Sequence, residues 1–215
     1  YKSFTNKIWN AANFLNLNDV KFIDQIDTKI ISLDSSKWIL KEFEEVQKKY
    51  FANIEKYQFH EIASLIYHFT WHTFCDWYIE FIKSDFKDPK KSEETKKISG
   101  WVFVQTLKLL HPIMPFITEK LWLSLVDNKS FLMSQNFVKV NFDPSFDNSK
   151  KYILKIIEIL TSLRNLRADL NISYKNEIDI IIDTKNSSLK DFITNYQTEF
   201  KRLLKIKSIL FKENT

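Results

Sequence analysis

A single glycine, Gly100, occurs among the 215 residues of this chain. Phosphate-binding loops, dinucleotide fingerprints and nucleophile elbows each need several positions where a side chain would collide or where φ must be positive. The chain therefore has no ordinary nucleotide-binding catalytic core, and we assign it no catalytic residue. Four prolines and 44% hydrophobic residues further exclude collagen-like, disordered and turn-rich β architectures, which leaves a helical fold.

Side chains that bind metal ions are also few. Cys75 is the only cysteine, which excludes a disulfide framework and a multi-thiolate zinc site and indicates a reducing compartment. His68, His72 and Asp76 share helical spacing with Cys75, but such residues are mostly packed or solvated, and we predict no metal site. No apolar run reaches about 18 residues and no signal peptide is visible, so we expect a cytoplasmic protein.

Hydrophobic periodicity predicts a mainly α protein in two parts. Residues 1–148 should form an antiparallel helical bundle with a connecting strap at 128–148, and residues 149–215 a long helix plus a small α+β appendix. The third helix of the bundle is apolar on several sides and should occupy its middle. Strands are expected at 177–183 and 207–211. Helices are expected over residues 5–17, 34–54, 58–84, 92–110, 116–126, 149–170 and 189–205.

Charge is distributed unevenly along the chain. Residues 1–148 hold 19 Lys, no Arg and 19 acidic residues, whereas residues 149–215 hold 10 Lys, 3 Arg and 8 acidic residues. The whole net charge of +5 therefore belongs to the last third. A local basic surplus suits a polyanionic partner, although it is a weak signal by itself.

A stripe of amide side chains lies on the helix expected at 5–17. Asn6, Asn10 and Asn13 fall on one face at 100° per residue, with Trp9 and Phe14 at its flanks. Two amides one turn apart can hydrogen-bond the edges of unstacked bases, and neighbouring rings can stack on those bases. The pattern suits single-stranded RNA, but an Asn-rich chain also scatters Asn over solvated helix faces.

Two of the three arginines, Arg164 and Arg167, lie on the apolar stripe of the helix expected at 149–170. A guanidinium there needs carboxylates, phosphates or an exit from the core. A favourable helix-end charge or an intramolecular ion pair explains them as well as a phosphate or interdomain role does. Trp77 is by default a core aromatic residue unless a cleft opens beside it.

Five segments give these features a common interpretation. In chain order they are NKIWNAANF at 6–14, WILKEF at 38–43, FTWHTFCDWYIE at 69–80, LLHPIMPFITEKLW at 109–122 and RNLRADLNI at 164–172. Together they resemble the C-terminal part of valyl-tRNA synthetases over nearly the whole chain. The fourth segment marks the valine, isoleucine and leucine branch of the class I synthetases, whereas the first and third are similar to the valyl enzymes.

This resemblance implies an anticodon-binding helical bundle from an enzyme that uses ATP and magnesium to ligate valine to tRNA-Val. Neither class I nucleotide signature nor the inserted editing domain occurs in the sequence. We therefore expect a fragment that needs no cofactor itself and does not aminoacylate tRNA alone. Its expected partners are tRNA-Val and the enzyme's own catalytic domain, without DNA or a membrane, and we expect a monomer.

The resemblance also implies which residues contact the anticodon. In the related methionine enzyme, two polar residues one turn apart on the first bundle helix and a Trp on a later helix contact anticodon bases. By motif these positions match Asn6, Asn10 and Trp77, although the second is Arg in that relative. We expect Trp77 or Trp9 to stack on bases and the two amides to read base edges.

Lys7, Arg164 and Arg167 are the side chains we expect to hold the RNA backbone. Valyl enzymes commonly have Arg-Phe where this chain has Asn13-Phe14, which removes one phosphate contact. Two alternatives remain open. The chain could be the anticodon domain of an isoleucyl- or leucyl-tRNA synthetase, or a helical protein-interaction scaffold whose amide stripe is an ordinary solvated face and whose basic appendix docks an acidic partner.

Overall fold

The structure, a computed structural model, describes residues 2–28, 31–126, 130–173 and 175–212. Its contacts divide the chain into two compact units, Tyr1–Ile153 and Leu154–Thr215. The division falls inside helix α7 (Phe146–Asp169), five residues after the boundary between 148 and 149 that the sequence analysis expected. The expected fold class, a mainly α protein with a small α+β part, is confirmed. Among the described residues, no helix combines the length and apolar composition that crossing a membrane requires.

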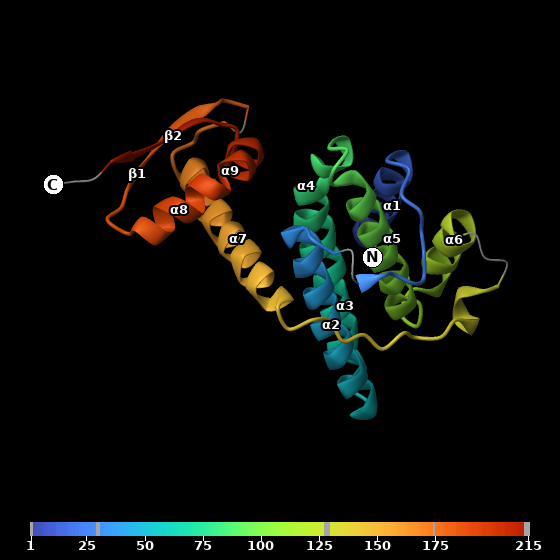
Figure 1. The fold of residues 1–215 in the computed structure, drawn as a ribbon. Helices are drawn as coiled ribbons and strands as arrows, with labels where there is room; N and C mark the ends of the chain where they lie inside the picture. The colour runs from blue at the N-terminus through green and yellow to red at the C-terminus, as the bar shows by residue number, and fades with distance from the viewer. Residues whose placement is uncertain (1, 29–30, 127–129, 174, 213–215) are drawn as a thin grey trace. The chain divides into compact units, whose positions relative to one another are not determined.

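The first unit is a bundle of helices (Figure 1). Helix α1 runs in the same direction as the helical run from residue 59 to 82. Phe4, near the start of α1, stacks on Trp71, and Phe14, near its end, meets Phe86, which follows that run. The helical elements of this unit before α7 are α1 (Lys2–Leu17), α2 (Asp34–Glu55), α3 (Phe59–His68), η2 (Phe69–Tyr78), α4 (Ile79–Ile82), η3 (Asp85–Lys87), α5 (Ser92–Leu110), α6 (Pro115–Leu125) and η4 (Leu132–Ser134).

The single helix expected at 58–84 is continuous, but its middle ten residues, η2, form a π-helix. Its predicted place in the middle of the bundle was wrong. Phe59 is 64% exposed, whereas every residue from 98 to 110 of α5 is buried. Helix α5 packs against α1, α2, α3 and α6 (Figure 1) and is therefore the central helix of the unit.

Gly100 in α5 allows the link between α1 and α2 to approach closely. A Cβ atom at this position would lie 2.1 Å from the carbonyl oxygen of Lys21. The same link is held by Asp24, whose carboxylate accepts hydrogen bonds of 2.6 Å from Gln105 Nε2 and from Lys108 Nζ. The only glycine of the chain thus serves helix packing rather than a turn.

Buried polar side chains of α2 hold the strap through hydrogen bonds to its backbone. Gln47 donates to the Val138 carbonyl at 2.7 Å and accepts from the Val140 amide at 3.0 Å. Glu44, 1% exposed, accepts from the Phe142 amide at 3.3 Å. Burial by itself would raise the pKa of the Glu44 carboxyl, but hydrogen bonds from two lysines and this amide outweigh burial and lower that pKa. Residues 127–129, which include the first two residues of the expected strap, lie outside the described residues.

The second unit contains the rest of α7, β1 (Ile178–Asp183), α8 (Ser187–Asn195), α9 (Gln197–Leu204) and β2 (Ile206–Lys212). The two expected strands are confirmed and pair in parallel. The single helix expected at 189–205 was wrong, because the chain breaks at Tyr196 into α8 and α9. Lys205, with a left-handed φ of 52°, turns the chain from α9 into β2.

Candidate nucleic-acid interface

The amide stripe of α1 faces solvent. The apolar face expected from the periodicity is buried: Ile8, Ala11, Ala12 and Leu15. Asn6, Asn10 and Asn13 are exposed on the other side of the helix, and Trp9 is 40% exposed. The helix therefore presents amides and a ring to anything that binds there.

An ion pair joins this helix to the turn that carries Trp77. Lys7 Nζ lies 2.5 Å from Asp76 Oδ1, and each side chain is about one-third exposed, at 33% and 34%. Asp76 directly precedes Trp77 in η2. The pair therefore places the Trp77 turn beside the turn of α1 between Asn6 and Asn10.

Trp77 is neither fully buried nor fully exposed. Its ring stacks on Phe81 at 6.2 Å between centroids and an interplanar angle of 29°. Phe81 is buried against Trp38 of α2. The contact with Phe81 thus anchors the Trp77 ring to the core. The stacking of a base on this ring stays a prediction.

Of the residues considered as metal ligands, Cys75 is buried, and His72 lies beside Asp76. Burial raises the pKa of the Cys75 thiol to about 12, so the thiol stays protonated at neutral pH. His72 Nδ1 lies 3.3 Å from Asp76 Oδ2. Across the parts of the chain that the structure describes, no three His, Cys, Asp or Glu side chains are grouped to hold a metal ion.

The two arginines of α7 differ in their surroundings. Arg164 is half-buried, and its phosphate contact stays a prediction. Arg167 is 5% exposed, and its guanidinium donates to the carbonyls of Leu204 and Ser173 at 2.7 Å and of Asn176 at 2.8 Å. This corrects the expected role: Arg167 ties α7 to the loop before β1 and to the end of α9, and its buried guanidinium binds protein carbonyls instead of the RNA backbone.

We expect Arg167→Ala to destabilise the second unit by about 2–4 kcal/mol, because buried carbonyls lose a charged donor. Hydrogen exchange of the β1 and β2 amides should accelerate, while that of α5 amides should not change. Arg164→Ala, one turn earlier on the same helix, is the matched control and should have a smaller effect. Equal exchange in the two variants would show that the carbonyl contacts of Arg167 contribute little.

Asp76 is a residue of this candidate interface that the sequence analysis missed. It was considered only as a metal ligand, whereas the structure makes it the partner of Lys7. Its place next to Trp77 was visible in the sequence. The pairing itself was not, since the two residues are 69 positions apart in the chain.

Comparison with known proteins decides which kind of domain this interface belongs to. Residues 36–182 match the family described as "Anticodon-binding domain of tRNA ligase". The chain belongs to this family. The match runs from the first turns of α2 to the strand β1, so it covers the centre of the bundle but not α1. The matched residues therefore do not include the amide stripe of this anticodon-binding domain.

Those relatives are valine–tRNA ligases. The ligase of Pelagibacter ubique is 40% identical over 219 residues, which cover 99% of this chain and 25% of the relative. The ligase of Syntrophotalea carbinolica is 32% identical over 221 residues, covering 98% of the chain and 24% of the relative. That of Staphylococcus saprophyticus is 32% identical over 197 residues, covering 90% and 22%. The chain thus spans about a quarter of the length of these relatives.

Proposed function

We propose that this chain is the anticodon-binding part of a valine–tRNA ligase and that it recognises the anticodon loop of tRNA-Val. The family match and the 40% identity to a protein named valine–tRNA ligase support this assignment. The observation that carries the site is the Lys7–Asp76 ion pair. It links the helix that carries the exposed amides to the residue next to the half-buried Trp77, which supports a shared surface for unpaired bases.

In this proposal each side chain has one task. The amides of Asn6 and Asn10 offer a donor and an acceptor to base edges, and the ring of Trp77 or Trp9 stacks on a base. The ammonium of Lys7 has three donors, so it can bind a phosphate while it keeps its contact with the carboxylate beside it. Asp76 is a positioning residue, since it holds Lys7 at the edge of the interface.

Ligation itself belongs to the rest of the ligase in this proposal. ATP and magnesium would supply activation of valine there, but the residues of this chain do not fit either group. A single glycine provides no phosphate loop, and the described residues contain no grouped metal ligands. We propose that the chain alone does not aminoacylate tRNA, that it is a monomer, and that it acts in the cytoplasm.

The test is binding of an anticodon stem–loop of tRNA-Val, measured by fluorescence anisotropy over a range of salt. Affinity should fall as salt rises, because phosphate contacts release counterions, and Lys7→Ala should make the log–log slope shallower by about 0.7. Lys49→Ala, an exposed lysine on α2, should leave the slope unchanged. Identical slopes for the two variants would remove Lys7 from the interface.

The same assay separates the alternative assignments. Stem–loops with isoleucine or leucine anticodons should compete poorly against the valine loop. Tighter binding of either loop would move the chain to that synthetase. An acidic protein that binds more tightly than every RNA loop would instead support a protein-interaction scaffold.

A further inference from the structure

A row of planar side chains lies on α3 and the first turn of η2. We call Tyr67, His68, Trp71 and His72 the ring cluster. Tyr67 lies 5.7 Å from His68 and 5.6 Å from Trp71 between ring centroids. The imidazoles of His68 and His72 stack at 5.4 Å and 30°. The four rings therefore form one continuous set of contacts.

The ring cluster is a surface and not part of the core. Tyr67 is 37% exposed, the His72 side chain is 52% exposed, and His68 is exposed as well. Trp71 is half-buried and rests on Phe4 of α1, with centroids 6.1 Å apart and rings 17° from parallel. Phe4 is itself buried, so the exposed rings stand on a rigid support.

This surface is continuous with the interface proposed above. Lys7 Nζ lies 5.5 Å from the centroid of the Trp71 ring. His72 contacts the carboxylate of Asp76, which also binds Lys7. If an RNA loop contacts Lys7, its neighbouring nucleotides can therefore reach the ring cluster.

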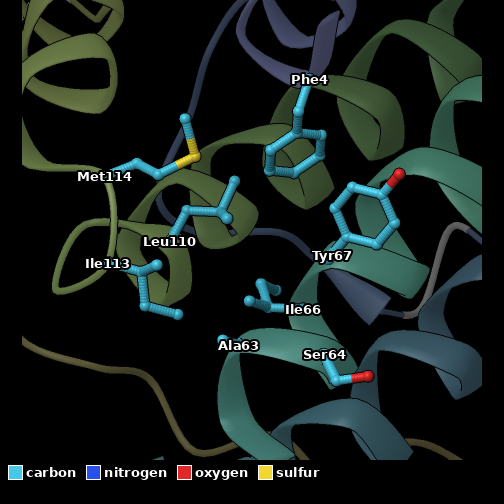
Figure 2. Close-up of a pocket in the computed structure, with 8 residues that line it drawn as sticks. All are labelled: Phe4, Ala63, Ser64, Ile66, Tyr67, Leu110, Ile113 and Met114. Carbon is cyan, nitrogen blue, oxygen red and sulfur yellow. The ribbon is translucent and has the colours of Figure 1, made fainter. Parts of the chain in front are cut away.

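An apolar pocket of about 350 Å³ adjoins the ring cluster through Phe4 and Tyr67 (Figure 2). Figure 2 shows Leu110 and Met114 beside this space, while the hydroxyl groups of Ser64 and Tyr67 point away from it. The lining is mostly apolar, so the pocket offers a base few partners for its polar edge. The exposed rings outside the pocket are better suited to a base, because stacking needs only a planar face.

We propose that the ring cluster is a second base-stacking surface, which takes an unpaired nucleotide of the RNA loop next to those read by Asn6 and Asn10. The proposal rests on the proposed function. Rings stack on the face of any base, and imidazole N–H groups can donate to a phosphate or a ribose hydroxyl. None of the four side chains is an amide that reads base edges, so this contribution should not depend on the anticodon.

The double variant His68→Ala and His72→Ala tests the ring cluster. It should bind the anticodon stem–loop of tRNA-Val about tenfold more weakly, the loss expected for one stacking contact. A loop with a different anticodon should lose affinity by the same factor. His60→Ala is the matched control, because His60 lies on the same helix with its side chain 80% exposed but outside the ring cluster. Its affinity should equal that of the unchanged chain.

Further variants separate the possible failures. His68→Phe with His72→Phe keeps the rings and should retain most of the affinity; a loss as large as that of the alanine pair would overturn stacking. The ring cluster is also overturned if the alanine pair binds like His60→Ala while Asn10→Ala with Trp77→Ala weakens binding, and the proposed function then stands. If the unchanged chain binds neither loop, the proposed function fails first.

Discussion

Asn10→Ala combined with Trp77→Ala should lower the affinity for the anticodon stem–loop of tRNA-Val by about 30-fold or more, since a base-edge or stacking contact is worth about 1–3 kcal/mol. A loop with another anticodon should lose far less. Asn10 is exposed on α1, and Trp77 directly follows Asp76, which pairs with Lys7 of that helix. Competition of the two loops for the same protein measures the discrimination directly.

The control for this double variant is Asn16→Ala. Asn16 is exposed on α1 but lies on a different side of the helix from Asn10, so its removal should change neither affinity. Thermal melting should confirm that all variants keep the fold. Equal losses for both loops would reject base reading by Asn10 and Trp77, and would leave only contacts with the RNA backbone at this surface.

Gly100→Ala should destabilise the first unit by about 2–3 kcal/mol, the cost of overpacking a dense interior. Two effects oppose each other at this position. Alanine favours a helix over glycine by about 1 kcal/mol, but its Cβ would meet the Lys21 carbonyl oxygen at 2.1 Å. A backbone atom cannot rotate away as a side chain can, so the overlap should win. The melting temperature should fall by roughly 5–10 °C.

Ser99→Ala provides a comparison at the neighbouring position. Ser99 is fully buried, but its hydroxyl makes only a 3.3 Å hydrogen bond within its own helix. We expect a change of less than about 1 kcal/mol, as for the loss of one weak hydrogen bond. A Gly100→Ala protein that melts at or above the temperature of the unchanged chain would show that the backbone at residues 20–21 can shift away from the new Cβ atom at little cost.

The interface residues differ in how far the sequence could predict them. The exposure of Asn6 and Asn10 follows from the same periodicity that buries Ile8 and Leu15, and both predictions are confirmed. Arg167 lay on an apolar stripe, and the sequence left its partner open. Only the folded chain brings the carbonyl of Leu204 to its guanidinium, because that contact depends on where α9 ends.

The sequence by itself determined the helical class, most helix positions and the solvent face of α1, because each depends on residues three or four positions apart. Tertiary structure decided that α5 is central and that Lys7 meets Asp76. These features depend on close packing between segments distant in the chain. The periodicity of a single segment contains no information about which other segment it will contact.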